Sequence, residues 1–211
     1  MAQAPRHRES IVQTAARLFR QQGFAATGLN QIVEESAAPK GSLYHYFPEG
    51  KEAIGAAAVA WAGERVVHTL ADLAKDSGGP ADLVRRYAAL LGGWMAASDF
   101  RDGCPIATTL LETAPRSPSI RDAGAHALTE WARVFSDALQ ARGVHPLRAG
   151  RLGALAVASI EGALLQSRVA VSPQPLVEAA EEVALAFEAA IDDAPRAEPG
   201  AVRPAIKASR T

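Results

Sequence analysis

Cysteine, long apolar runs and net charge are all nearly absent from this chain of 211 residues. Its single cysteine, Cys104, excludes an intramolecular disulfide and a cysteine-based zinc site, and it favours a reducing compartment. No apolar run reaches the roughly 18 residues of a membrane span, and no apolar signal-peptide segment follows the N-terminal arginines. We therefore expect a cytoplasmic protein without a membrane partner.

The formal net charge is −1 and the pI is about 6.5, which is not typical of a non-specific nucleic-acid binder. The charge is unevenly distributed, however. Residues 1–51 carry six basic and four acidic side chains, whereas the remainder carries 16 basic and 19 acidic ones. The sign of this difference favours DNA contact confined to the N-terminal part.

Helical patterns occupy almost the whole chain. Alanine is abundant, and no stretch alternates apolar and polar residues with period two, so we expect an all-α fold. The predicted helices span residues 6–22, 27–36, 39–46, 51–74, 80–97, 105–113, 117–142, 146–171 and 173–191, with Thr27 as the N-cap of the second. Residues 192–211 are rich in proline, alanine and charge, which predicts a disordered tail.

Residues 23–51 predict a helix-turn-helix followed by the start of a long helix. Ala37 and Ala38 form a short turn, and Leu43 and Phe47, four residues apart, would anchor the second helix on the first. Gly41 would let the backbone approach DNA closely. The side chains left exposed are small, hydroxyl, aromatic and basic, which suits the major groove, namely Lys40, Ser42, Tyr44 and His45.

The run from Lys40 to Phe47, with Gly23, Thr27 and Ile32 before it and Lys51-Glu52 after it, resembles the DNA-binding domain of TetR-family transcriptional regulators. Three segments together resemble a subgroup of drug-responsive, LmrA-like repressors: Ala-Pro-Lys-Gly-Ser at 38–42, Phe-Pro-Glu-Gly-Lys at 47–51 and Asp-Gly-Cys-Pro at 102–105. The resemblance implies a three-helix DNA-binding domain at 1–50 and a six-helix effector-binding and dimerisation domain at 51–191. Three features depart from the family pattern: Ala37 replaces the usual turn glycine, Pro39 replaces a serine or threonine that contacts phosphate, and Glu49-Gly50 makes the link between Phe47 and Lys51 one residue longer than usual.

The resemblance also assigns roles in DNA binding. Thr27, Tyr44 and Lys51 would contact phosphates, the last with help from the positive end of its helix. Lys40, Ser42 and His45 would reach base edges or nearby phosphates. The implied function is a ligand-responsive regulator, a repressor released from a palindromic operator by a small apolar or cationic effector. The alternative is a helical small-molecule-binding protein or enzyme with a vestigial helix-turn-helix.

A homodimer is expected, because two-fold symmetric half-sites require two reading helices about 34 Å apart. In the family, the last two helices of each subunit form a four-helix interface. Candidates on these helices are Leu152, Leu155, Ser159, Ala163, Gln166, Val177, Ala180, Ala184 and Phe187. The same faces could instead close the core of one subunit.

The family's effector pocket lies among the middle helices. Candidates here are Tyr87, Leu91, Trp94, Met95, Cys104, Leu111, Trp131, Phe135 and Glu161, although each tryptophan could be ordinary core. Glu161 and Glu112 interrupt apolar stretches, and a buried carboxylate would need Arg168, Arg133 or a ligand cation as its partner. Cys104 could be structural, or a redox or electrophile sensor.

Enzymatic signatures are missing from the sequence. The five histidines show no metal-ligand spacing, and we find no phosphate loop, dinucleotide fingerprint or nucleophile elbow. We therefore expect no catalytic residues, no metal and no cofactor.

Overall fold

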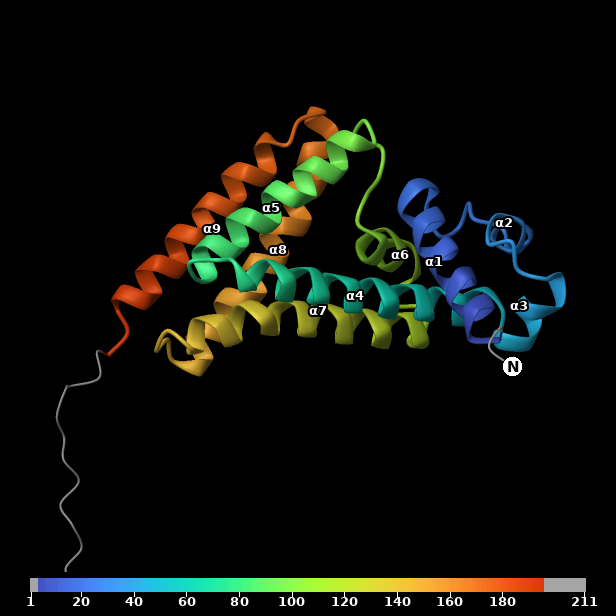
Figure 1. Cartoon of the computed structure of the whole chain (residues 1–211), viewed down its shortest axis with the longest axis horizontal. Helices are drawn as coiled ribbons and strands as arrows, with labels where there is room; N and C mark the ends of the chain where they lie inside the picture. Colours follow the sequence, from blue (N-terminus) through green and yellow to red (C-terminus); the bar gives the residue numbers. More distant parts are fainter. Residues whose placement is uncertain (1–3, 196–211) are drawn as a thin grey trace, which may run out of the picture.

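Residues 4–195 are described by a computed structural model, and this part of the chain contains nine α-helices and no strand (Figure 1). The helices are α1 (Ala4–Gln22), α2 (Leu29–Glu35), α3 (Lys40–Tyr46), α4 (Lys51–Lys75), α5 (Pro80–Ala97), α6 (Pro105–Thr113), α7 (Pro118–Gln140), α8 (Pro146–Ala170) and α9 (Gln174–Asp192). The expected all-α fold is confirmed, and each boundary lies within two residues of its predicted position. The predicted disordered tail falls largely on residues 196–211, outside the described residues.

Glycine and proline set many of the helix boundaries. Gly23 adopts a φ of 88° directly after α1, a left-handed conformation that glycine reaches without a steric penalty. Four helices of the larger body begin at a proline, whose fixed φ suits the first turn, where its missing N–H is not needed. These prolines are Pro80, Pro105, Pro118 and Pro146.

The helices α1, α2 and α3 gather at one end of the molecule, on the right in Figure 1. Their shared core contains Ile11, Phe19, Ile32 and Leu43, all fully buried. Because α2 and α3 have only seven residues each, their stability depends on packing against α1 and α4 rather than on helix propensity.

The helix α4 links this end to the rest of the molecule. It has 25 residues and is therefore about 38 Å long. Ile54 belongs to the core with α1, Val59 to a second core with α6 and α7, and Leu70 to the largest core. At Gly63 the helix approaches α7 so closely that a Cβ atom would lie 2.6 Å from the Cβ of Ala127. One rigid helix therefore contacts all three cores.

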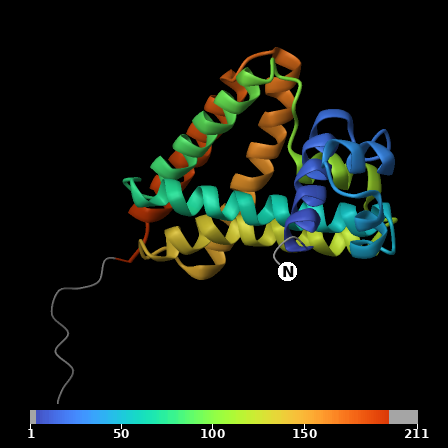
Figure 2. The same cartoon turned by 45° about the vertical axis from the view of Figure 1, so that its right-hand side comes forward.

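In the larger body, α4 and α7 lie side by side, and α5, α8 and α9 rise from them as an inclined arm (Figures 1 and 2). The main core lies among these five helices and includes Tyr87, Trp131, Phe135 and Phe187. No helix within residues 4–195 is long and apolar enough to cross a bilayer.

Candidate functional site

The helix α3 is held by two apolar side chains and presents the opposite face to solvent. Leu43 is fully buried and Phe47 is 3% exposed, as their four-residue spacing predicts. Tyr44 is 64% exposed, and Gly41 and His45 are also exposed. A Cβ atom at Gly41 would have no neighbour within 4 Å, so the backbone there is open to a large partner. Ser42 is half-buried.

The turn between α2 and α3 is tied to α1. Ser10 Oγ donates a hydrogen bond of 2.7 Å to the carbonyl oxygen of Ser36. Ala37 follows with a φ of 53°, in the left-handed region that favours glycine, and Ala38 is buried. The turn therefore has the expected position and fixes the direction of α3.

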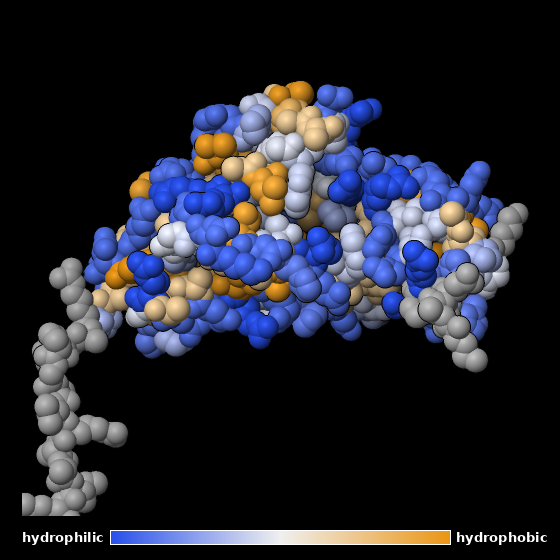
Figure 3. Space-filling view, in the orientation of Figure 1, coloured by the Kyte–Doolittle hydropathy of each residue, from blue (hydrophilic) through white to orange (hydrophobic). Residues whose placement is uncertain are grey.

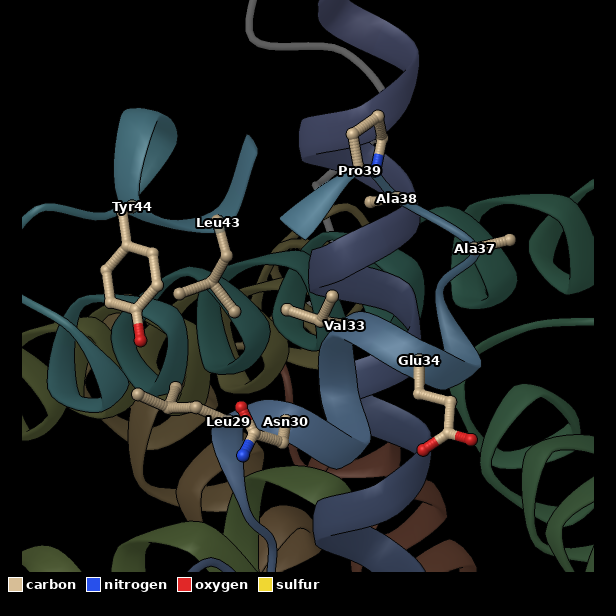
Figure 4. Close-up of a pocket in the computed structure, with 9 residues that line it drawn as sticks. All are labelled: Leu29, Asn30, Val33, Glu34, Ala37, Ala38, Pro39, Leu43 and Tyr44. Atoms are coloured by element: carbon tan, nitrogen blue, oxygen red, sulfur yellow. The ribbon is translucent and has the colours of Figure 1, made fainter. Parts of the chain in front are cut away.

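A surface groove of about 850 Å³ separates α2 from α3 (Figure 4). Val33 and Leu43 lie between the two helices, Tyr44 stands at one end, and Glu34 lies at the other. An apolar floor and a carboxylate do not suit a phosphate. The surface best suited to DNA is therefore the exposed face of α3 rather than this groove.

Thr27 lies elsewhere than expected. Its side chain is fully buried, and its hydroxyl donates a 2.7 Å hydrogen bond to the carbonyl oxygen of Gly23. The N-cap of α2 is Gly28, so the predicted cap at Thr27 is wrong. Because the hydroxyl is occupied and buried, Thr27 fixes the turn after α1, and we remove its side chain from the candidate phosphate contacts.

Lys51 is also engaged within the chain. Its Nζ donates a 3.2 Å hydrogen bond to the carbonyl oxygen of Ala25 and lies 4.6 Å from the ring centroid of Phe24. Burial lowers the pKa of Lys51, and the nearby Glu112 carboxylate partly opposes this effect. The lysine thus joins the start of α4 to the turn between α1 and α2.

The same turn is held from the other side by α6, a contact that the sequence analysis missed. The carboxylate of Glu112 accepts hydrogen bonds from the backbone N–H of Phe24, at 3.0 Å, and of Ala25, at 2.6 Å. Gly23 leaves room for it, because a Cβ there would lie 2.3 Å from Oε1. The sequence analysis identified Glu112 as a carboxylate that would need a partner, but it expected a charged partner. The actual partners are backbone amides, which leave no signal in a sequence.

A second link joins α1 to the loop before α6. Arg20 forms a 3.0 Å ion pair with Asp102, and the backbone N–H of Gly103 donates a 3.1 Å hydrogen bond to the carbonyl oxygen of Arg20. Residues 102–112 therefore contact α1 and the turn after it at two separate points.

Four of the nine candidate pocket residues converge in the larger body. The rings of Tyr87 and Trp131 meet edge to face, with centroids 5.8 Å apart, and both are almost fully buried. The carboxyl group of Glu161 and the thiol of Cys104 are neighbours that influence each other's pKa, and both also influence the pKa of Tyr87. We call Tyr87, Cys104, Trp131 and Glu161 the polar cluster.

Two polar atoms of this cluster are buried without a protein partner among the described residues, Trp131 Nε1 and Glu161 Oε1. An unsatisfied buried group costs about 1–3 kcal/mol, so each of these atoms calls for an explanation. Neither arginine proposed for Glu161 forms an ion pair with it within residues 4–195, and Arg133 instead pairs with Glu130.

Burial dominates the protonation of the polar cluster. It raises the pKa of the Glu161 carboxyl, although the neighbouring Cys104 thiol partly offsets the shift. It also raises the pKa of the Cys104 thiol, with a further contribution from the Glu161 charge. The pKa of Tyr87 is raised for the same reasons. Burial therefore disfavours the charged forms of all three groups.

The other five pocket candidates lie outside the polar cluster, in two different environments. Leu91, Met95 and Phe135 are buried in the main core. Trp94 is 53% exposed and Leu111 is 84% exposed. These two therefore lie on the surface of α5 and α6, contrary to the expectation that they line the pocket. A helical period alone did not reveal which side of these helices faces outward.

The dimer candidates divide into two groups. Five are buried in the core of their own chain and offer a partner no surface, which corrects the expectation for Leu152, Ala163, Ala180, Ala184 and Phe187. Ser159 is half-buried. The exposed ones are Leu155, Gln166 and Val177.

The exposed apolar stripe of α8 includes residues that the sequence analysis missed. Leu155, Ala158, Gly162, Leu165 and Val169 recur at helical spacing, and all are exposed. Leu165 is 65% and Val169 is 79% exposed. The available signal was that α8 is apolar on two faces rather than one. Figure 3 shows apolar residues at the surface of the arm built from α5, α8 and α9.

Metal binding finds no support among the described residues, where no group of three histidine, cysteine or acidic side chains could hold an ion.

Comparisons with known proteins agree with this geometry. Residues 11–58 match the family described as bacterial regulatory proteins, tetR family, and residues 80–182 match the LmrA/YxaF-like C-terminal domain of transcriptional regulators. Two regulators of Bacillus subtilis (strain 168) are each 36% identical to the chain. YxaF matches over 83% of this chain and 92% of its own length, and LmrA over 81% and 90%.

Among solved structures, a TetR transcriptional regulator from Chloroflexus aurantiacus is similar at a TM-score of 0.72 and 28% identity. The match covers 89% of this chain and 97% of the other. These relatives are transcriptional regulators, not enzymes. The chain belongs to the TetR family of transcriptional regulators and carries a C-terminal domain of the LmrA/YxaF-like type.

Proposed function

We propose that this regulator is a cytoplasmic repressor that binds a palindromic operator as a homodimer and is released by a small-molecule effector. Residues 1–50 would bind DNA, and residues 51–191 would hold the effector and form the dimer. The observation that carries the DNA-binding part is the face of α3, where Gly41, Tyr44 and His45 are exposed while Leu43 and Phe47 anchor the helix.

The supporting contacts to DNA follow from this face. Tyr44 would donate its hydroxyl to a phosphate, and His45 would reach a base edge or a nearby phosphate. Lys40 and Ser42, at the start of the same helix, remain candidates for base edges. Lys51 would act mainly by orienting the turn between α1 and α2, because its Nζ is bound to Ala25.

Dimerisation would bury the exposed stripe of α8 against its symmetry mate. Leu155, Leu165 and Val169 offer apolar area, while Ala158 and Gly162 allow two helices to approach closely. Val177 and Leu185 extend the apolar surface onto α9. A self-complementary patch of this kind is what a two-fold symmetric interface requires.

Effector binding would reach the DNA-binding end along two routes. The helix α4 contacts all three cores, and residues 102–112 connect the polar cluster, through Cys104, to Arg20 and to the turn held by Glu112. A shift of α6 or α4 would change the separation of the two reading helices and weaken operator binding. The effector must then prefer the released state by several kcal/mol.

The deciding experiment is selection of bound sequences from a random duplex pool by the purified protein. We expect a palindromic consensus whose binding weakens steeply with salt. Tyr44→Ala should cost about 1 kcal/mol per half-site, from a lost phosphate contact. The matched control is Trp94→Ala, which removes a similarly exposed aromatic ring away from α3 and should leave the affinity unchanged.

Absence of any enriched sequence at low salt would contradict the DNA-binding proposal. A transcript that falls when the gene is deleted would instead identify an activator.

A further inference from the structure

The polar cluster contains one buried hydrogen-bond donor and one buried acceptor that have no partner among the described residues. Trp131 is 1% exposed, and its Nε1–H is a donor without an acceptor within residues 4–195. Oε1 of Glu161 is a buried acceptor without a donor in the same part of the chain, although the residue as a whole is half-buried. The two unpaired atoms belong to adjacent helices, α7 and α8. The ring of Trp131 also packs edge to face against the ring of Tyr87. Native interiors rarely leave such groups unpaired.

We propose that the polar cluster binds an organic cation that also carries a hydrogen-bond acceptor. The cationic group would lie against Glu161 and the aromatic rings of Tyr87 and Trp131, and the acceptor would meet the Trp131 N–H. This inference rests on the proposed function, because it names the chemical class of the effector.

The charge pattern selects a cation over an anion. Glu161 is an acid without a basic partner among the described residues, since Arg133 pairs with Glu130 and Arg168 forms no ion pair with it. An anionic ligand would therefore meet a carboxyl group with no compensating charge. A cation supplies the missing countercharge, and a buried carboxylate is stable only when it is paired.

The aromatic neighbours select the same class. Tyrosine and tryptophan rings attract a cation over their faces, most strongly where water is excluded. Tyr87 is 2% and Trp131 is 1% exposed, so the two rings are shielded from water. A neutral ligand would gain apolar contact from the rings, but it would leave the acidic group without a charge partner.

The test compares two esters of nearly equal shape. Benzoylcholine carries a quaternary cation, an ester acceptor and a phenyl ring, and 3,3-dimethylbutyl benzoate replaces its nitrogen by carbon. Binding to the full-length protein without DNA is measured by calorimetry and by tryptophan fluorescence. We expect the wild-type protein to prefer benzoylcholine by at least about tenfold.

Variants locate the preference. Glu161→Gln keeps the shape and removes the charge, so it should abolish the preference while the affinity for the neutral ester stays the same. Glu64→Gln removes an exposed carboxyl group from α4 and should change neither affinity. Trp131→Phe keeps an aromatic ring but removes the donor, and it should weaken both esters by a similar factor of about three.

Three outcomes would overturn the proposal: equal affinity of the wild-type protein for the two esters, an unchanged preference in Glu161→Gln, or no binding of either ester at millimolar concentration. The first and third do not depend on any variant folding correctly. A protein that selects an operator but shows no cation preference refutes only this inference. A protein that prefers the cation but selects no operator refutes only the proposed repressor function.

Discussion

At the scale of single residues, Ala37 occupies backbone space that an alanine rarely adopts. Its φ of 53° places it in the left-handed region, which costs a residue with a Cβ roughly 1–2 kcal/mol, part of which glycine loses again in chain entropy. Ala37→Gly should therefore stabilise the protein by about 0.5–1 kcal/mol. Urea denaturation checks this, with Ala38→Gly as the control that should destabilise. A less stable Ala37→Gly variant would contradict the strain argument.

Glu161 makes the stability of the protein depend on pH. Burial raises its pKa above that of the unfolded chain, so the folded state holds a proton that the unfolded state loses. Its contribution is fully present below the unfolded pKa and is lost as pH rises through the folded pKa. Glu161→Gln should therefore become more stable relative to wild type as pH rises from 4.5. Denaturation curves across that range measure the difference, and a constant difference would contradict it.

Cys104 has the environment of an unreactive thiol. Burial and the neighbouring Glu161 charge raise its pKa, so little thiolate is present near neutral pH. We expect iodoacetamide to modify it at least about tenfold more slowly than free cysteine at pH 8. Mass spectrometry over time gives the rate. Modification as fast as that of free cysteine would restore the sensor alternative.

At the scale of elements, α6 holds the turn that follows α1 in place through hydrogen bonds. Glu112 receives the N–H groups of Phe24 and Ala25, and these two bonds are lost together in Glu112→Ala. Hydrogen exchange at these two amides should accelerate at least about fivefold, since each bond to a charged acceptor contributes about 1 kcal/mol or more. Exchange measured by NMR tests this, with Glu64→Ala as the control. Unchanged protection would show that the two hydrogen bonds to Glu112 are not needed to hold the turn.

The helices themselves were predictable, because glycine and proline mark their ends and the apolar period is strong. The cap of α2 was not, because Thr27 turned its hydroxyl back to Gly23 and left the cap position to Gly28. The partner of Glu112 was equally hidden, since backbone amides occur everywhere in a sequence. The interface prediction was partly wrong because α8 is apolar on two faces. Leu152 and Leu155 are both apolar, and only their orientation separates core from surface.

At the scale of the whole molecule, the exposed stripe of α8 predicts the consequence of a single charge. In a symmetric dimer Leu165→Glu would place two carboxylates in one apolar contact, and each would lose its hydration. We expect the dimer to weaken at least about a hundredfold. Sedimentation velocity shows the change, with Leu111→Glu, at a more exposed apolar site on α6, as the control. A dimer that survives Leu165→Glu would place the interface elsewhere.

The closed packing of Tyr87 and Trp131 also limits how quickly the protein could respond. With both rings almost fully buried, a ligand would reach them only after the surrounding helices have opened, so opening would become a separate kinetic step. The observed association rate would rise with ligand concentration and then level off at the opening rate. The regulator would then filter out brief pulses of its effector and respond to sustained exposure.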